Sequence, residues 1–288
     1  MPVTPLYPMK KSHQLDLEEL SPLLLCPPQS YVGNCPDGAE DVPLKITENV
    51  VLSCRFYPAA PEAATLIYFH GGCESTDSFD AEAAFFLQAG INVFLSSYRG
   101  FGKSSGVPQL TAVIEDAEIQ YAQAREWLKG KGFSGAVIVM GRSLGSVCAV
   151  NVVAQNQESI KAMILESAFS ENLLLPKTNG LEENTVLFEF NNFNTLEKIS
   201  TIKVPTLIFH GARDMLVPVS QVEKLQSASA AKNKQFLLIP GADHYSVSKT
   251  GGNLFYKTIK GFIDSVCGVN TWRQRRKTFK AGVEGEKT

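Results

Sequence analysis

The sequence predicts an α/β fold in which a mostly parallel central sheet carries helices on both faces. Continuous apolar runs such as Thr65–His70, Ala136–Met140 and Thr206–Phe209 are typical of strands buried on both sides. Segments of helical period alternate with these runs, which is the pattern of βαβ units. At 288 residues, with 44% hydrophobic and 19% charged composition, the chain is long enough to bury such a core as one domain.

The first part of the chain predicts an arm followed by an antiparallel sheet edge. Residues 1–40 are rich in proline and are expected to form an arm next to a catalytic domain of residues 41–268. Val42–Thr47 and Val50–Tyr57 have strand character and are predicted to pair as a hairpin. The buried strand after them stops at His70-Gly71-Gly72-Cys73, and the two glycines predict a loop of unusual conformation there.

The rest of the chain continues the alternation of strands and helices. The expected elements are helix Ser78–Ala89, strand Ile91–Leu95, helix Leu110–Gly130, strand Ala136–Met140, helix Leu144–Gln155, strands Ala162–Leu165 and Thr206–Phe209, helix Val219–Ala230, strand Gln235–Ile239 and a helix near Leu254–Val266. Residues 169–202 interrupt this order and are too long for a usual connection. Their apolar residues, among them Phe188 and Phe193, predict a small lid over a bound ligand or, alternatively, a completion of the core.

The middle of the chain carries Gly141-Arg142-Ser143-Leu144-Gly145 between an apolar strand and a helix of small residues. In this context the pentapeptide predicts a sharp turn that holds Ser143 in a strained conformation, where a Cβ at either glycine would collide with its surroundings. The turn directs the serine hydroxyl out at the carboxyl edge of the sheet. It also places the backbone N–H of Leu144 at a helix N-terminus, where negative charge is favoured.

A serine hydroxyl needs a base to remove its proton and an acid to orient that base. The sequence offers four histidines: His13, His70, His210 and His244. His244 is the candidate base because it lies in a loop just past the last strand, whereas His70 and His210 close buried strands and suit structural hydrogen bonds. Asp214, past the preceding strand, is the candidate acid. Glu166 is the alternative, and Asp243 adjoins the histidine too closely to reach its Nδ1.

Five motifs together resemble those of a known fold family: His70-Gly71-Gly72, Tyr98-Arg99-Gly100-Phe101-Gly102, Gly141-Arg142-Ser143-Leu144-Gly145, His210-Gly211-Ala212-Arg213-Asp214 and Gly241-Ala242-Asp243-His244. With the order Ser143, Asp214, His244, the chain resembles the α/β-hydrolase fold family from about residue 42 to residue 267. It looks most like the small-lid serine hydrolases, which include protein depalmitoylases and bacterial esterase or lysophospholipase-like proteins. By this resemblance Gly72, or alternatively Cys73, supplies a second oxyanion N–H beside Leu144.

The resemblance implies acyl transfer to water from an ester or thioester, with an acyl-enzyme on Ser143 and no need for a metal or organic cofactor. The alternative is a non-catalytic module that keeps the pocket for a ligand or a partner. A serine at the nucleophile position argues against epoxide and haloalkane hydrolysis. Two departures from the family are Ser97, where many relatives carry aspartate, and the absence of the lipidated cysteine-rich N-terminus of the eukaryotic depalmitoylases.

Composition and charge indicate which classes of binding partner to expect. A net charge of −2 and a pI near 6.1 give no overall field for nucleic acid. No apolar run reaches the roughly 18 residues of a transmembrane helix, and no secretory signal precedes the domain, so a cytoplasmic location is expected. Residues 269–288 form a tail with the basic cluster Arg273, Arg275, Arg276, Lys277 and Lys280, whose contact with anionic lipid is a hypothesis.

The six cysteines show no CxxC or other metal-ligand spacing and are expected to be reduced thiols. Only one disulfide is suggested by local spacing, between Cys26 and Cys35.

Overall fold

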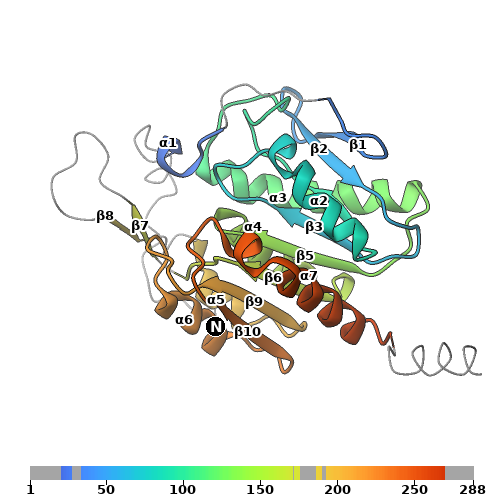
Figure 1. Ribbon diagram of the computed structural model, residues 1–288. Helices are drawn as coiled ribbons and strands as arrows, with labels where there is room; N and C mark the ends of the chain where they lie inside the picture. Colours follow the sequence, from blue (N-terminus) through green and yellow to red (C-terminus); the bar gives the residue numbers. More distant parts are fainter. Residues whose placement is uncertain (1–20, 28–33, 171, 176–185, 190–192, 270–288) are drawn as a thin grey trace, which may run out of the picture.

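The computed structural model describes residues 21–27, 34–170, 172–175, 186–189 and 193–269. Its centre is an eight-stranded sheet of order β1-β2-β4-β3-β5-β6-β9-β10 (Figure 1). The strands are β1 (Glu40–Lys45), β2 (Val51–Tyr57), β3 (Thr65–Phe69), β4 (Asn92–Leu95), β5 (Val137–Arg142), β6 (Ala162–Glu166), β9 (Thr206–Gly211) and β10 (Lys234–Ile239). β2 pairs antiparallel with β1 and β4, and every other neighbouring pair in this sheet is parallel. The predicted fold class is therefore confirmed.

Helices cover both faces of the sheet. They are α2 (Thr76–Gln88), α3 (Leu110–Gly130), α4 (Leu144–Asn156), α5 (Thr195–Ile199), α6 (Val219–Ala228) and α7 (Val247–Val266), with a short 3-10 turn at Gln157–Ser159. Figure 1 shows α2 and α7 in front of the sheet and α3 behind it. The buried residues separate into two apolar clusters, one with side chains of α2 and α7 and the other with side chains of α3, α4, α5 and α6.

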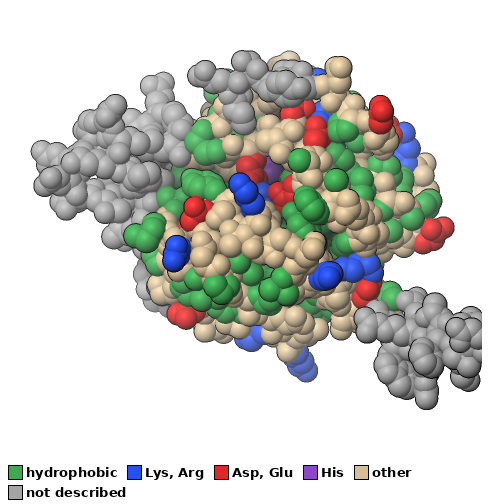
Figure 2. All heavy atoms as spheres, viewed as in Figure 1, with side chains coloured by type: hydrophobic (Ala, Val, Ile, Leu, Met, Phe, Trp, Pro, Cys, Tyr) green, Lys and Arg blue, Asp and Glu red, His purple; other side chains and the backbone are tan. Residues whose placement is uncertain are grey.

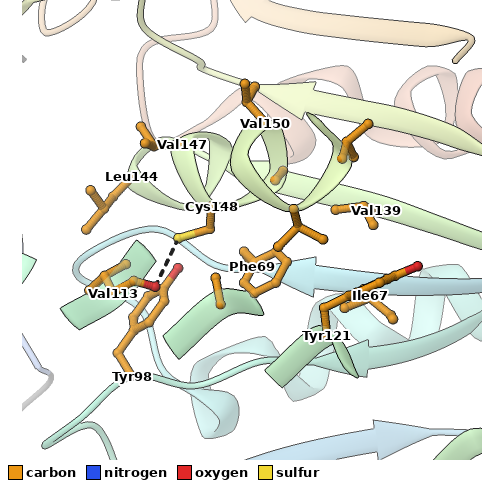
Figure 3. Packing of buried hydrophobic residues seen from close by; sticks show 14 of the residues in the cluster. Ile67, Phe69, Tyr98, Val113, Tyr121, Val139, Leu144, Val147, Cys148 and Val150 are labelled. Atoms are coloured by element: carbon orange, nitrogen blue, oxygen red, sulfur yellow. Dashed lines mark hydrogen bonds between the residues drawn. The ribbon is translucent and has the colours of Figure 1, made fainter. Parts of the chain in front are cut away.

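The alternation of side chains along each strand feeds both clusters. On β3, Ile67 and Phe69 pack toward α3 and α4, whereas Leu66 and Tyr68 pack toward α2 and α7. Figure 3 shows part of the first of these layers, where the Cys148 thiol of α4 points toward α3 and lies 3.7 Å from the carbonyl of Val113. A strand with both faces buried has to be apolar throughout, which explains the continuous runs in the sequence.

α7 begins at Val247 and not near Leu254, where the apolar spacing predicts its start. The two parts of the helix meet at Gly252, whose φ of 48° and ψ of −134° are not helical. Adjacent glycines at 251 and 252 have low helix propensity, so they conceal the first turn in the sequence. In the described part of the chain, no helix combines the length and the apolar character that spanning a bilayer requires.

The long interruption after β6 contains a separate antiparallel pair, β7 (Asn172–Leu175) and β8 (Val186–Glu189), followed by α5. The hairpin lies at the left of the molecule in Figure 1, beyond the main sheet. Phe193 is only 4% exposed and belongs to the apolar cluster around α4, together with Ile199 and Ile202. Phe193 thus contributes to the core, as the alternative predicts, and a small lid over a bound ligand stays a prediction.

The described end of the N-terminal arm packs against the loop after β3. A short helix, α1 (Ser21–Leu24), precedes Leu25, which is 2% exposed, and the N–H of Cys26 donates to the carbonyl of Gly72 at 2.8 Å. Leu24 and Leu25 extend the same apolar cluster as Leu144. This part of the arm thus completes the core at the edge where the strands of the parallel sheet end.

The cysteine prediction requires correction, because Cys26 forms a disulfide with Cys73 across 47 residues. The expected pairing of Cys26 with Cys35 is wrong, and so is the expectation that all six thiols are reduced. The fold determines the partner by laying the arm over the loop after β3, which local spacing does not reveal. Disulfides persist mainly in oxidising compartments, so this bond argues against the expected cytoplasmic location, which stays a prediction.

Candidate active site

Ser143 stands between the last residue of β5 and the first residue of α4, with a φ of 51° and a ψ of −118°. A Cβ on Gly141 would lie 2.2 Å from the carbonyl oxygen of Gly145, and a Cβ on Gly145 would lie 2.0 Å from that of Phe69. Both distances are far below contact, so the predicted crowding is confirmed. The turn is tight because the start of α4 is pressed against β3 and β5.

Three side chains meet in one hydrogen-bonded chain at the carboxyl edge of the sheet. The Ser143 hydroxyl lies 2.7 Å from Nε2 of His244, and Nδ1 of the same ring lies 2.8 Å from Oδ2 of Asp214. With the proton on Nδ1, the ring donates to the carboxylate and presents a lone pair to the serine hydroxyl. His244 is 4% exposed and Asp214 is 7% exposed, so these contacts are largely shielded from water.

Hydrogen bonds from nearby loops hold Asp214 and His244 in place. Oδ1 of Asp214 accepts the backbone N–H groups of Leu216 at 2.9 Å and of Val217 at 2.7 Å, which leaves Oδ2 for the histidine. The carbonyl of His244 accepts the Ser167 hydroxyl at 3.0 Å. The contacts to Asp214 come from the loop that follows it, and the contact to His244 comes from the residue after β6. The carboxylate and the histidine backbone are therefore held in place by hydrogen bonds.

The other described histidines have structural contacts, as the sequence predicts. Nδ1 of His70 donates to the carbonyl of Gly71 at 2.7 Å, and Nε2 of His210 donates to the carbonyl of Val217 at 2.9 Å. Burial lowers the pKa of both rings below the usual histidine value, which favours their neutral forms. His13 lies outside the described residues.

The two alternative acids lie elsewhere. Glu166 is 2% exposed at the end of β6, and its carboxylate faces Arg142 at 2.9 Å from Nε. The Asp243 carboxylate accepts the hydroxyl of Ser246 at 2.6 Å and the N–H of Tyr245 at 3.1 Å. Within the described residues, neither carboxylate forms a hydrogen bond with the imidazole of His244, whose Nδ1 is taken by Asp214.

The loop after β3 approaches the start of α4. Gly72 needs to be glycine because its Cβ would lie 1.8 Å from the carbonyl oxygen of Leu24 and 3.3 Å from a methyl group of Leu144. Within the described part of the chain, its N–H has no backbone acceptor. Leu144 is the first residue of α4, so the helix itself does not use its N–H. Cys73, the alternative donor, is held in the disulfide with Cys26.

Arg142 is the residue whose role the sequence analysis misses. Its guanidinium binds carboxylates of Glu74, Glu82 and Glu166 at 2.8, 2.5 and 2.9 Å, and its side chain is 10% exposed. A charged residue directly between a buried strand and the serine is a signal in the sequence, but its partners lie on three separate segments. Ser97, the departure from the family pattern, pairs its hydroxyl with that of Ser104 at 2.9 Å and so still anchors the following loop.

Figure 2 shows a histidine at the base of a hollow that is bordered by acidic, basic and apolar side chains. Two large apolar side chains next to the hydrogen-bonded chain are exposed, Met215 at 84% and Tyr245 at 75%. The hydrogen-bonded chain therefore has an opening to solvent, with apolar groups beside it.

Comparisons with known proteins agree with this architecture. A model of the family described as serine aminopeptidase, S33, matches residues 60–182. An α/β-hydrolase domain-containing protein of Arabidopsis thaliana, WAV2, is 28% identical over 245 residues, covering 78% of each chain. The uncharacterized protein YfhR of Escherichia coli K12 is 26% identical, covering 82% of this chain and 84% of its own length.

Solved structures share the fold at low sequence identity. The esterase Pf2001 of Pyrococcus furiosus superposes with a TM-score of 0.67 at 21% identity, covering 83% of this chain and 98% of its own. A soluble variant of the monoglyceride lipase of Saccharomyces cerevisiae, in complex with a substrate analog, gives a TM-score of 0.64 at 16% identity, covering 84% and 99% of the two chains.

Proposed function

Because this chain belongs to the α/β-hydrolase fold family, we propose that it is a serine hydrolase that cleaves carboxylic esters or thioesters. The observation that carries the proposal is the contact chain from the Ser143 hydroxyl through His244 to Asp214, with distances of 2.7 and 2.8 Å. Such a chain supplies a nucleophile, a base and a group that orients the base. Esterase and lipase chemistry in proteins of the same fold supports the choice of substrate class.

In the acylation step, Oγ of Ser143 attacks the carbonyl carbon while Nε2 of His244 takes its proton. Asp214 holds the ring through Nδ1 and stabilises the positive charge that the ring gains. The N–H groups of Leu144 and Gly72 donate to the oxygen on which negative charge develops. The bond to the leaving group then breaks, and His244 returns the proton to the leaving alkoxide or thiolate.

In the deacylation step, a water molecule gives a proton to Nε2 of His244 and attacks the ester carbon on Ser143. A second oxyanion forms in the same place and is stabilised by the same two N–H groups. When it collapses, the carboxylic acid leaves and Oγ of Ser143 takes its proton back from the imidazolium. Each cycle consumes one water and returns the protein to its starting state.

The test is turnover of a panel of p-nitrophenyl esters of increasing chain length, run beside acyl thioesters and an aminoacyl p-nitroanilide. We expect ester or thioester cleavage, with Ser143→Ala and His244→Ala lowering kcat by roughly 10³- to 10⁶-fold because the members act as a unit. Asp214→Asn should lose somewhat less. If Ser143→Ala kept more than about a tenth of the activity, the assignment of the nucleophile would be wrong.

Labelling by a fluorophosphonate separates this proposal from a non-catalytic binding module. An activated serine reacts with the probe, and the label should map to Ser143 and disappear in Ser143→Ala. Cleavage of the anilide in preference to every ester would instead assign peptidase chemistry, in line with the description of the matching family model.

A further inference from the structure

Arg142 occupies the variable position before the serine in the Gly-x-Ser-x-Gly pentapeptide, and its guanidinium makes polar contacts with four side chains. Nη1 donates to Glu74 at 2.8 Å, Nη2 to Glu82 at 2.5 Å and Nε lies 2.9 Å from Glu166. Nη2 also lies 3.2 Å from the Ser248 hydroxyl on α7. The guanidinium therefore joins the residue directly before Ser143 to the loop after β3 and to α2, β6 and α7.

Glu74 connects this arginine to the loop that holds the proposed oxyanion donor. One carboxylate oxygen accepts from Arg142, and the other accepts the backbone N–H of Gly71 at 2.8 Å. The N–H of Glu74 itself closes a turn onto the carbonyl of Gly71 at 3.3 Å. Gly71 directly precedes Gly72, so the carboxylate fixes the peptide that leads into the donor.

Charge and burial make this connection rigid. Burial alone would raise the pKa of Glu74, but Arg142 and the other partners lower it below its usual value, so the carboxylate is ionised at neutral pH. A partly buried ion pair adds little stability, because desolvation offsets much of the attraction between the charges. Its geometry is nevertheless well defined, since an arginine fork and a carboxylate prefer a narrow set of orientations.

We infer that Arg142 and Glu74 are positioning residues, which hold the Gly71-Gly72 loop in place beside the Ser143 turn. The inference rests on the proposed function, because it assigns the loop to the oxyanion. The Ser143 turn and the Gly71-Gly72 loop follow the neighbouring strands β5 and β3, and the ion pair of Arg142 with Glu74 connects them. An oxyanion donor displaced by about 1 Å loses much of its effect on the transition state while substrate binding changes little.

Glu82 provides a matched control. It binds the same guanidinium as Glu74 from α2, but within the described residues it forms no hydrogen bond with the loop. When its carboxylate is removed, Arg142 keeps Glu74, Glu166 and Ser248 as partners, so the connection to Gly71 remains. The two glutamates therefore separate loop positioning from the general loss of one ion pair to Arg142.

The experiment compares Glu74→Ala, Glu74→Gln and Glu82→Ala by steady-state kinetics on the best p-nitrophenyl ester and by thermal unfolding. We expect Glu74→Ala to lower kcat by about 10- to 100-fold with KM within about threefold, since one oxyanion donor is worth about 10²- to 10³-fold. Glu74→Gln keeps an acceptor for Gly71 and should recover most of kcat. Glu82→Ala should keep kcat within about threefold of the wild type, even if its melting temperature falls as far as that of Glu74→Ala.

Equal loss of kcat in Glu74→Ala and Glu82→Ala, or a raised KM with unchanged kcat in Glu74→Ala, would overturn the inference and leave the cluster a purely structural one. If Glu74→Ala fails to fold, Glu74→Gln decides: a kcat lowered about tenfold or more relative to the wild type, although the acceptor for Gly71 is kept, would overturn the inference as well. Turnover and fluorophosphonate labelling of the wild-type protein test the proposed function separately. A wild-type protein that shows neither overturns that function and this inference together.

Discussion

Ser143 has backbone angles that L-residues rarely adopt, with a φ of 51°. Such a conformation costs about 1 to 3 kcal/mol, and the packing of β3, β5 and α4 maintains it. We predict that Ser143→Gly unfolds at a higher temperature than Ser143→Ala, since glycine relieves the strain and alanine keeps it. Both variants lack the hydroxyl, so calorimetry on two inactive proteins isolates the backbone contribution. A Ser143→Gly protein less stable than Ser143→Ala would show that the turn carries little strain.

Glu166 predicts a pH dependence of stability. Burial raises its pKa from 4.5 to about 7, which the attraction of Arg142 only partly offsets. Between these two values the folded protein binds more protons at this site than the unfolded chain does, so its contribution to stability falls as the pH rises and is constant above the folded pKa. The free energy of unfolding of Glu166→Gln, relative to that of the wild type, should therefore rise by about 1 to 3 kcal/mol between pH 5 and pH 8.

Denaturant unfolding of the wild type and Glu166→Gln at several pH values measures this difference. The exposed Glu158, changed to Gln, is the control for the loss of a carboxylate as such. Only the difference between variant and wild type is informative, because two buried histidines also make stability depend on pH. His70 and His210 have lowered pKa values, so their contribution to the stability of the protein increases as the pH rises toward the pKa of free histidine. A difference that is flat across this range would contradict the assignment.

At the scale of elements, α2 begins directly after the loop that carries Glu74. Ser75 caps it: its hydroxyl accepts the N–H of Ser78 at 3.3 Å, and the Ser78 hydroxyl accepts the N–H of Ser75 at 2.9 Å. Ser75→Ala should destabilise the protein by about 0.5 to 2 kcal/mol, which lowers the melting temperature by a few degrees. Ser227, exposed in the last turn of α6, serves as the control, because alanine there removes no N-terminal cap. Equal melting temperatures for the two variants would contradict the capping role.

The sheet and its order of helices could be predicted because each strand is buried on both faces and therefore carries a continuous apolar run. The candidate residues at the carboxyl edge followed from the same logic, since Asp214 and His244 each come just after a strand. The partners of Arg142, the disulfide of Cys26 and the pairing of β7 with β8 could not be predicted. Each depends on contacts between segments far apart in the sequence, for which neither periodicity nor spacing carries a signal.

At the scale of the whole molecule, the two ends of the chain are expected to differ in their importance. The basic tail, residues 270–288, lies outside the described residues, and its contact with anionic lipid stays a prediction. All the proposed catalytic and positioning groups lie between Gly71 and His244. Deleting the tail should therefore leave turnover of a soluble ester unchanged, and sedimentation of the full chain with anionic vesicles at low salt tests the lipid contact.

Deleting residues 1–27 should have the opposite result, since it removes Leu24 and Leu25 from the core and the Cys26 N–H from the carbonyl of Gly72. Loss of the two buried leucines alone should lower the free energy of unfolding by about 3 to 5 kcal/mol, and loss of the Cys26–Cys73 disulfide adds to this. The loop after β3 also loses its outer support, so kcat should fall even at temperatures where the shortened protein stays folded. Circular dichroism and ester turnover on both truncations, measured side by side, check the two expectations. An N-terminal truncation that keeps full kcat would show that β3, Glu74 and Arg142 hold the oxyanion loop without help from the arm.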